Sequence, residues 1–435
     1  MKRLVIVGGG YFGVDAYRAV LREAGREVRS GEIQMTVVSM GEHHAFHGWT
    51  GEVLGGIVAP AHMLTSLVGL LPRASFVHGR VVSADLVARK VTVHLPDDTE
   101  CVLPFDRLLL GTGSRDALEC LAGVREHGWC LKTPGDLHAF RAKLHAELRA
   151  DQLGRPALRV AVIGGGFAGV EMAAAIAELG RARGGREVQV HLIGSGERLL
   201  NELRPRYARL AEYAERELRA LGVELHLGPR ATAVTADGVR LASGAVVASD
   251  LTLFTAGVAF DVLPGTLDLP RDEQGRLVTD EFLRVSGRDD VFAGGDAAVV
   301  ARPSGGVCPT NALWAMKHGM WAGANAARSI QGRPLRRFSY GGLGQAASVG
   351  VGRGVTELKG VQFTGLPGWV LRLGFFAWYM PSRRQSVRVL RDWWQLAARG
   401  RRLDGEGTLN NSGVKPRSAP ALLRGERRGP GRVEQ

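Results

Sequence analysis

Cysteine is scarce in this sequence of 435 residues, which contains only Cys101, Cys120, Cys130 and Cys308. No two of these have the CxxC or CxxxxC spacing of a redox-active dithiol, so the sequence excludes a catalytic cysteine pair of that kind. The four thiols are dispersed along the chain. They favour a reducing, cytoplasmic environment.

Long apolar segments are missing as well. The run that follows the N-terminus, Leu4 to Val7, is typical of a β-strand and too short for the apolar core of a signal peptide, so we expect no secretory signal. An apolar stretch near the C-terminus, Gly368 to Met380, lies between Pro367 and Pro381. As a helix it would span about 20 Å, less than the roughly 30 Å hydrocarbon core of a membrane. We therefore expect no transmembrane helix.

Glycine is abundant by contrast, and it forms two fingerprints of one design. They are Gly8-Gly9-Gly10-Tyr11-Phe12-Gly13 and Gly164-Gly165-Gly166-Phe167-Ala168-Gly169. Each follows a short apolar run and leads into an alanine-rich helical pattern. The runs are Leu4 to Val7 and Val160 to Ile163, and the helical patterns are Val14 to Ala24 and Val170 to Arg181. A dinucleotide-binding loop requires this strand-turn-helix context, so the pair predicts two dinucleotide sites in an α/β fold.

The glycine spacing within each loop has a physical basis. The first glycine permits a tight turn, the second lets the backbone approach a pyrophosphate, and the third lets the helix pack on the strand. The phosphates then lie at the positive N-terminus of the helix. The residues expected in these roles are Gly8, Gly10 and Gly13 in the first loop and Gly164, Gly166 and Gly169 in the second.

Three further segments resemble elements of the flavoproteins that have two dinucleotide-binding domains. Asp290 to Asp296 is an apolar strand that ends in Gly-Gly-Asp, and the resemblance implies that its last residue binds the ribityl and phosphate region of FAD. Leu108 to Gly113 and Leu253 to Gly257 look like the family's crossings between the FAD and NAD domains. The residues of these crossings that we expect at the cofactors are Thr112, Gly113 and Gly257.

This resemblance implies two Rossmann-like domains, with the NAD(P) domain inserted in the FAD domain. The expected parts are an FAD domain at 1–118 and 259–335, an NAD(P) domain at 119–258 with its core at 157–255, a C-terminal region at 336–403 and a tail at 404–435. The tail is rich in Gly, Pro, Ser and Arg and is expected to be disordered.

Within that superfamily the chain is most similar to the type II NADH dehydrogenases, the single-chain, non-pumping NADH:quinone oxidoreductases, up to about residue 403. The matching stretches besides the fingerprints are Glu52-Val53-Leu54-Gly55-Gly56, Leu131-Lys132-Thr133, Gly169-Val170-Glu171, Glu197-Arg198-Leu199-Leu200 and Glu217 to Val223. The resemblance places Glu171 close to the flavin and the nicotinamide. The alternative is that Glu171 is a first-turn glutamate favoured by the helix dipole. Relatives that depend on paired cysteines, such as sulfide:quinone reductases, fit less well.

Both acidic residues that usually bind the ribose hydroxyls after the second strand are absent. The corresponding positions hold Ser39 and Gly194, and a glutamate follows each three residues later. At the FAD site Ser39 or Glu42 is expected to reach the adenosine ribose. At the nicotinamide site the missing carboxylate and the nearby Arg198 leave NADH and NADPH both open.

The quinone signature departs from the family pattern too. Where the family has an AQxxxQ helix, this chain has Leu313 and Lys317 in place of the two glutamines. Lys317 is the candidate that stabilises a developing quinol oxygen, with Asn311 and His318 as further polar groups nearby. No metal site is expected, because the adjacent His43, His44 and His47 lack carboxylate or thiolate support. We expect these histidines to border the flavin loop.

The C-terminal region is basic and aromatic, and it contributes much of the local excess behind the net charge of +13. On a helix, one face holds arginines and the other apolar residues, which is the pattern of an interfacial helix. The arginines are Arg384, Arg388 and Arg391, and the apolar residues are Val389, Leu390, Trp393, Trp394, Leu396 and Ala397. This predicts peripheral attachment to the inner face of the cell membrane. The alternative is a helical pair that caps the core or forms a homodimer. No nucleic-acid module accounts for the charge, so nucleic acid is not an expected partner.

We therefore expect an FAD-dependent NAD(P)H:quinone oxidoreductase with FAD as cofactor and NADH or NADPH as substrate. Two other functions stay open. One is a soluble NAD(P)H-dependent flavin oxidoreductase with a protein or small-molecule acceptor, which the loss of both glutamines favours. The other is a low-turnover, NADH-binding redox sensor.

Overall fold

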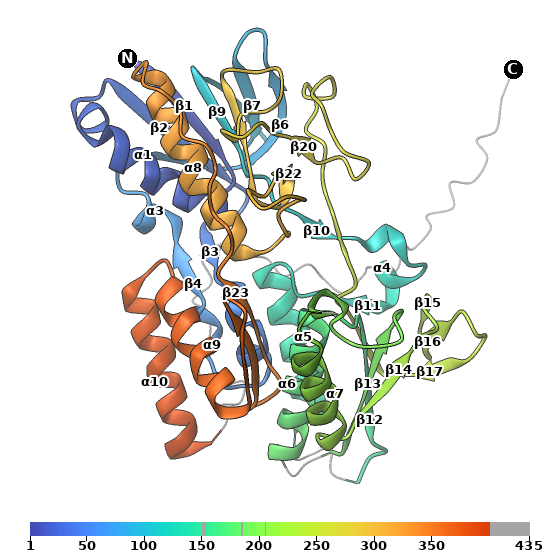
Figure 1. The fold of residues 1–435 in the computed structure, drawn as a ribbon. Coiled ribbons are helices and arrows are strands. Elements are labelled where there is room, and N and C mark those ends of the chain that lie inside the picture. The colour runs from blue at the N-terminus through green and yellow to red at the C-terminus, as the bar shows by residue number, and fades with distance from the viewer. Residues whose placement is uncertain (150–153, 184–185, 205, 401–435) are drawn as a thin grey trace, which may run out of the picture.

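Two parallel sheets organise the chain. The computed structural model describes residues 1–149, 154–183, 186–204 and 206–400, so the expected disordered tail at 404–435 lies outside the described residues. The first sheet belongs to the upper part of Figure 1 and the second to the lower right part. The C-terminal helices α9 (Gly365–Tyr379) and α10 (Arg383–Arg399) lie at the lower left.

The first sheet has the strand order β21-β9-β1-β2-β5, and all neighbouring strands are parallel. Its central strand is the predicted apolar run, which is buried from Leu4 to Val7. A buried parallel sheet requires such continuous apolar runs, because both of its faces are covered. The strands are β1 (Lys2–Val7), β2 (Ile33–Ser39), β5 (Ser75–His78), β9 (Arg107–Leu110) and β21 (Val291–Ala293).

Two long helices and an antiparallel sheet share the core of this first unit. They are α1 (Tyr11–Ser30), α8 (Ala312–Ile330) and the strands β6 (Arg80–Asp85), β7 (Lys90–His94) and β8 (Glu100–Pro104). Shorter elements complete it: β3 (His43–Ala45), α2 (Thr50–Leu54), β4 (Leu64–Ser66), α3 (Leu67–Leu70), β20 (Leu277–Val278) and β22 (Ala298–Val299).

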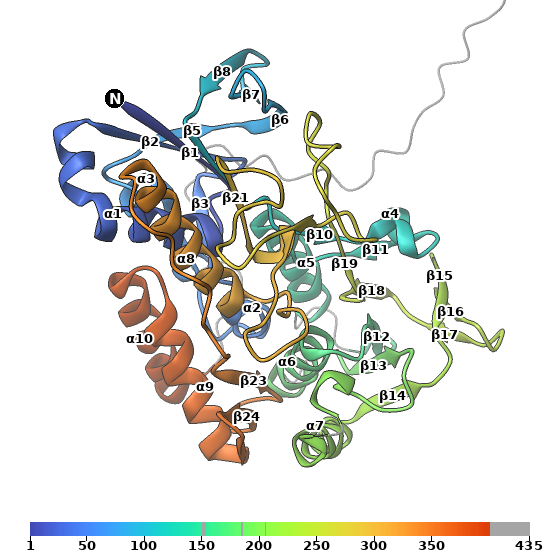
Figure 2. The same ribbon diagram turned by 45° about the horizontal axis from the view of Figure 1, so that its top comes forward.

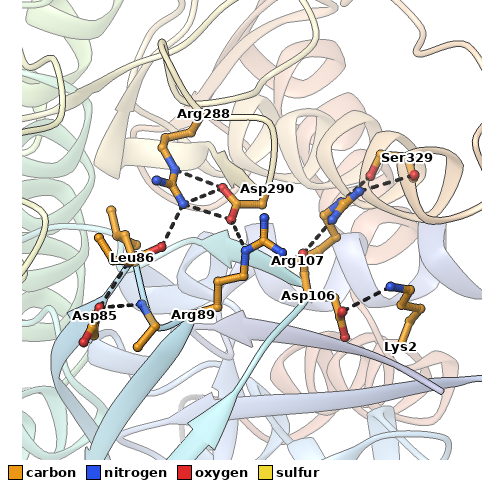
Figure 3. A network of polar contacts seen from close by, with 11 residues as sticks. Lys2, Asp85, Leu86, Arg89, Asp106, Arg107, Arg288, Asp290 and Ser329 are labelled. Atoms are coloured by element: carbon orange, nitrogen blue, oxygen red, sulfur yellow. Dashed lines mark hydrogen bonds and ion pairs between the residues drawn. The ribbon is translucent and has the colours of Figure 1, made fainter.

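A buried carboxylate fixes the place where the chain returns to the first sheet. Asp290, which directly precedes β21, is only 3% exposed. Its Oδ2 accepts hydrogen bonds from Nε of Arg89 and from Nη2 of Arg288, both at 2.9 Å (Figure 3). Nη2 of Arg288 also donates to the carbonyl of Leu86 at 2.9 Å. These bonds join the turn between β6 and β7 to a strand two hundred residues later in the chain.

The second sheet has the strand order β11-β18-β12-β13-β14 and is also parallel. Alternate residues of β12 face two different cores: Val160 and Val162 face α5, α6 and α7, whereas Ala161 and Ile163 face the antiparallel strands β15, β16 and β17. The parallel strands are β11 (Gly128–Trp129), β12 (Leu158–Ile163), β13 (Val188–Gly194), β14 (Val223–Leu227) and β18 (Leu251–Phe254). The other elements are α4 (Val124–His127), α5 (Pro134–Glu147), α6 (Phe167–Arg183), α7 (Ala208–Ala220), β15 (Ala231–Thr235), β16 (Gly238–Leu241) and β17 (Val246–Ala248).

The two chain segments that connect the units pair with each other. The outgoing segment contains β10 (Arg115–Asp116), the returning one contains β19 (Val258–Ala259), and the two strands are antiparallel (Figure 2). The second unit is therefore inserted in the first, as the resemblance implied.

The C-terminal region adds the antiparallel strands β23 (Gly344–Ser348), β24 (Gly354–Leu358) and β25 (Val361–Thr364) before the two helices. The helix α9 begins three residues before the apolar stretch Gly368 to Met380, so Pro367 lies inside its first turn. Proline is tolerated there, since the first backbone N–H groups of a helix have no intrahelical acceptor. None of the described helices is long and apolar enough to span a bilayer.

The close crossing of α1 and α8 depends on glycine. A Cβ added at Gly323 would lie 2.2 Å from the carbonyl oxygen of Ala16, and one at Gly319 would lie 2.2 Å from that of Phe12. We expect Gly323→Ala to lower the free energy of unfolding by about 1–3 kcal/mol, because the helices must move apart. Chemical denaturation of the variant measures this.

Gly374→Ala on α9 is the matched control, because a Cβ there meets nothing within 4 Å. Alanine has the higher helix propensity, so this variant should be neutral or up to about 1 kcal/mol more stable. Equal stability of Gly323→Ala and the wild type would contradict the close packing.

Candidate active site

Both glycine loops have the same backbone packing. A Cβ at Gly13 would lie 1.8 Å from the carbonyl oxygen of Gly8, and one at Gly169 would lie 1.7 Å from that of Gly164. Only glycine permits helix and strand to approach so closely in each unit. A Cβ at Gly10 would meet nothing within 4 Å, and the N-terminus of α1 has no side-chain cap. The first loop therefore leaves space and unpaired N–H groups for a phosphate.

Three segments meet beside the first loop. Asp296 follows β21, and its Oδ2 accepts a hydrogen bond from Oγ of Ser114 at 2.6 Å. The same Oγ accepts a hydrogen bond from Nζ of Lys132 at 2.7 Å. The predicted Thr112 and Gly113 lie just before Ser114, after the end of β9. Hydrogen bonds thus join Ser114 of the outgoing segment to Asp296, which follows β21, and to Lys132, which follows β11 of the second unit.

The histidines predicted to border this loop do so in part. Nδ1 of His44 lies 3.2 Å from the carbonyl oxygen of Gly9, and the hydroxyl of Tyr11 accepts a hydrogen bond from the backbone N–H of His47 at 2.8 Å. Burial lowers the pKa of both imidazoles to about 4, so they are neutral at physiological pH. The second ring nitrogen of His44 is buried and has no hydrogen-bond partner.

The two predicted ribose positions differ in their surroundings. Ser39 ends β2 directly beside Gly9, where a Cβ on that glycine would lie 2.8 Å from its Oγ. Glu42 is exposed, and its Oε1 lies 3.9 Å from Nδ1 of His78. Ser39 is therefore the nearer of the two to the glycine loop.

At the second loop, Gly194 ends β13 and lies against Gly165, and Gly257 follows β18. Arg198 is nearby, but its guanidinium forms an ion pair with Glu215 of α7 at 3.2 Å. Glu215 also accepts a hydrogen bond from the backbone N–H of Leu199 at 2.9 Å. Arg198 is thus held by a carboxylate.

A buried arginine joins the two units. Arg372 of α9 is 1% exposed, and its guanidinium contacts Oε1 of Glu52 at 2.5 Å and Oε1 of Glu171 at 2.8 Å. It also donates to the carbonyl of Gly48 at 2.9 Å. Glu52 lies on α2 of the first unit, and Glu171 lies on α6, directly after the second glycine loop. The backbone N–H of Ser348 donates a second hydrogen bond to Glu171 at 2.9 Å.

Burial raises the pKa of the Glu171 carboxyl, and the Arg372 guanidinium opposes this shift. The nearby Glu52 acts in the same direction as burial, because two carboxylates repel each other. A small cavity is lined by these three side chains together with Ser348 and Trp393. Glu171 is thus a partly buried acid at a cavity between the two units.

The structure does not place the two predicted catalytic residues in contact. Nζ of Lys317 lies over the rings of Tyr340 and Tyr379, at 5.3 Å and 5.8 Å from their centroids. Glu171 is bound by Arg372, two helical turns before Tyr379 on α9. Lys317 and Glu171 therefore both contact α9, at positions about two helical turns apart along it. Arg372 and Glu52 were not predicted as site residues, although Arg372 is the single charge in an otherwise apolar stretch and was a usable signal.

Some residues of α10 that were expected on its membrane-facing side are instead packed against the protein. Val389 is fully buried, and the ring of Trp393 packs edge-on against Trp369 at 4.9 Å. The carboxylate of Asp392 is buried and contacts Nδ1 of His62 at 2.6 Å. The expectation that Val389 and Trp393 lie at a membrane was therefore wrong, because they attach α10 to the protein core.

These features define a class of oxidoreductase that holds two dinucleotides in two Rossmann-type units and has an acidic site between them. The chain belongs to the pyridine nucleotide-disulphide oxidoreductase family, whose model matches residues 2–320. It lacks the cysteine pair of the disulphide-reducing members.

Similar proteins and solved structures show which members of this family the chain resembles. The chain is 27% identical over 398 residues to demethylphylloquinone reductase NdbB of Synechocystis sp., covering 90% of this chain and 95% of that protein. It is 26% identical over 421 residues to the type II NADH:quinone oxidoreductase NdhA of Mycobacterium tuberculosis, covering 90% and 86%. The structure of NDH2 from Plasmodium falciparum in complex with NADH has a TM-score of 0.79 at 14% identity, covering 92% and 99%. The predicted resemblance to type II NADH dehydrogenases is confirmed.

We expect Arg372→Gln to lower the free energy of unfolding by about 3–5 kcal/mol near neutral pH, because the buried Glu52 and the partly buried Glu171 lose their cation. The raised pKa of Glu171 sets the sign of the pH dependence. A group with a raised folded-state pKa loses stability as the pH rises through that pKa, so the defect should grow from about pH 5 to about pH 8. Thermal unfolding at both pH values measures it.

Arg353→Gln is the control. Arg353 also bridges two carboxylates, those of Glu178 and Glu217 at 3.2 Å and 3.3 Å, but its side chain is 41% exposed. Its loss should cost less than about 1 kcal/mol at either pH. Equal losses of unfolding free energy for the two variants would show that the ion pairs of Arg372 stabilise the protein no more than the exposed ion pairs of Arg353.

Proposed function

We propose that this chain is an FAD-dependent NADH:quinone oxidoreductase that does not pump protons. The observation that carries the proposal is the pair of glycine loops with equal packing, joined across the two units by Glu52, Arg372 and Glu171. The names of the relatives support the same reaction, since they are NADH:quinone and demethylphylloquinone reductases. When bound, FAD supplies hydride acceptance and electron transfer, so the protein's part is to position and separate the reactants.

The residues around the first loop fit an FAD. The open position at Gly10, the uncapped N-terminus of α1 and the free ring nitrogen of His44 leave space and polar groups for it. The residues that would hold FAD are Gly8, Gly10, Gly13, Ser39, Glu42, Thr112, Gly113 and Asp296. Those that would hold the nicotinamide dinucleotide are Gly164, Gly166, Gly169, Gly194, Arg198 and Gly257.

The second loop favours NADH over NADPH. A 2′-phosphate would need a free cation, and the guanidinium of Arg198 is already paired with Glu215. Two further contacts hold this glutamate, the backbone N–H of Leu199 and the guanidinium of Arg204 at 3.5 Å. Arg198 would therefore have to give up its carboxylate before it binds a phosphate.

Glu171 and Lys317 are the proposed residues at the reacting groups. Arg372 and the N–H of Ser348 hold the carboxylate of Glu171 in one place. The ammonium of Lys317 lies over two tyrosine rings, and a cation there would stabilise negative charge on the oxygen of a quinone being reduced.

The test is anaerobic stopped-flow mixing of the flavin-containing protein with NADH or NADPH, followed by mixing with a water-soluble quinone. We expect faster loss of flavin absorbance with NADH, and recovery of the absorbance with quinone. Lys317→Met should slow the recovery by about tenfold or more and leave the first phase unchanged. Lys143→Met, an exposed lysine on α5 that pairs with Glu147, is the control.

Bleaching without recovery by quinone would move the assignment to a soluble acceptor or to a redox sensor. The observation that favours a different acceptor is that Leu313 and Lys317 replace the two glutamines of the family's quinone helix. The same experiment tests this second candidate.

We further propose that the chain attaches peripherally to the inner face of the cell membrane through the outer surface of β25, α9 and α10. Eight exposed apolar residues gather there: Val361, Leu366, Val370, Leu371, Trp378, Val387, Leu390 and Trp394. Trp378 and Trp394 are 68% and 70% exposed, which is unusual for tryptophan in water but typical of the headgroup region of a bilayer. Exposed Arg384, Arg388 and Arg391 lie beside them, where they would face anionic lipids.

The variant that replaces Trp378, Leu390 and Trp394 by Ser should lose binding to anionic liposomes by at least about tenfold, because three large apolar side chains no longer enter the interface. Co-sedimentation with vesicles of anionic and of neutral lipid measures this. Val87→Ser, at a position that is 94% exposed outside the C-terminal region, should bind like the wild type. Unchanged vesicle binding with a lower oligomeric mass would instead assign the surface to a homodimer.

A further inference from the structure

Three metal-ligating side chains meet at the edge of the second sheet. His191 lies on β13, and Glu224 and His226 lie on β14, the last strand of that sheet. His191 pairs in register with Glu224, and His226 is two residues further along the same strand. Side chains alternate along a strand, so all three point to one face. It is the face opposite α6 and α7, because Leu192 and Val223 belong to the helical core.

The distances among these side chains fit one face of a tetrahedron. Nδ1 of His191 lies 3.1 Å from Nε2 of His226 and 3.2 Å from Oε2 of Glu224. Nε2 of His226 lies 3.7 Å from Oε1 of the same carboxylate. A tetrahedral zinc ion with bonds of about 2.0–2.1 Å separates its ligand atoms by about 3.3–3.4 Å. The observed separations lie on both sides of this value.

Hydrogen bonds among these three side chains cannot by themselves pair all of the contacting nitrogen and oxygen atoms. A neutral imidazole carries one hydrogen, and Nδ1 of His191 faces a ring nitrogen and a carboxylate oxygen at the same time. One hydrogen can serve only one of these contacts. Within the part of the chain that the structure describes, no lysine or arginine forms an ion pair with Glu224. A cation at the centre would receive lone pairs from all three groups.

The site is also rigid and accessible. Both histidines project from neighbouring strands of one parallel ladder, and their side chains are only 14% and 23% exposed. Glu224 is 64% exposed, so an ion and a water molecule can enter from its side. Figure 1 shows β13 and β14 between α7 and the strands β15 to β17.

We propose that His191, Glu224 and His226 bind one divalent transition-metal ion of the zinc class, outside the two dinucleotide sites. Two imidazoles and one carboxylate are ligands that suit zinc, with water as the fourth. Because the ligands come from β13 and β14, the ion links the edge strand to the rest of the sheet. Its binding free energy therefore adds to the stability of the second unit.

Isothermal titration of the full-length, flavin-containing protein with Zn²⁺ tests this, after treatment with a chelator and removal of any histidine tag. We expect one ion per chain for the wild type. His226→Gln and Glu224→Gln should each raise the dissociation constant by about tenfold or more. His94→Gln is the matched control, because His94 is a strand histidine that faces a single carboxylate, Asp98, at 3.6 Å. It should bind zinc like the wild type.

Thermal unfolding provides a second readout that does not depend on the heat of binding. Zn²⁺ at about ten times the wild-type dissociation constant should raise the melting temperature of the wild type and of His94→Gln by about 2 °C or more, and that of His226→Gln by clearly less. Equal affinity of the wild type and His226→Gln would place the ion elsewhere and overturn the site. The absence of binding at millimolar Zn²⁺ would overturn it too, and would mean that the two histidines share only a hydrogen bond.

Discussion

The ion pairs of Arg372 are the interaction on which the rest of the structure depends. One guanidinium contacts a carboxylate from α2 and a carboxylate from α6, and its own helix comes from the C-terminal region. Three parts of the chain that are far apart in sequence thereby meet at one buried point. Withdrawing three charged groups from water is costly, even though Glu171 is only partly buried, and their attraction offsets this cost only when all three are present. The C-terminal region is for this reason a part of the site between the two units as well as a cover over them.

The double role of α9 follows from this arrangement. Its inner face carries Arg372 and the partly buried Phe376, whose ring centroid lies 4.4 Å from the guanidinium carbon. Its outer face exposes Val370 and Trp378. Under the proposed membrane attachment, the outer face of α9 would lie at the bilayer while its inner face contacts Glu171 through Arg372. That arrangement would bring a membrane quinone close to the proposed site, although both glutamines of the family's quinone helix are absent from α8.

Sequence reasoning predicted the fold well, because the signals were local. Each glycine loop lies within about thirty residues of the apolar strand before it and the helix after it, and each step follows from backbone geometry. The positions of Asp296 and of the crossings near Gly113 and Gly257 required the family resemblance as well. The faces of α10 were predicted only in part, since Leu390 and Trp394 are exposed whereas Val389 and Trp393 are buried. Periodicity gives the faces of a helix but not what each face contacts.

The sequence by itself determined the two dinucleotide-binding units, because a glycine loop between a buried strand and a helix can form few other structures. It also determined the basic, aromatic character of the C-terminal region. Only the tertiary structure decided that Arg372 pairs with Glu52 and Glu171 and that His191 meets Glu224 and His226. These contacts join residues from different strands and helices, and their distances depend on how those elements pack. Side-chain chemistry names the candidates, and packing alone selects which of them meet.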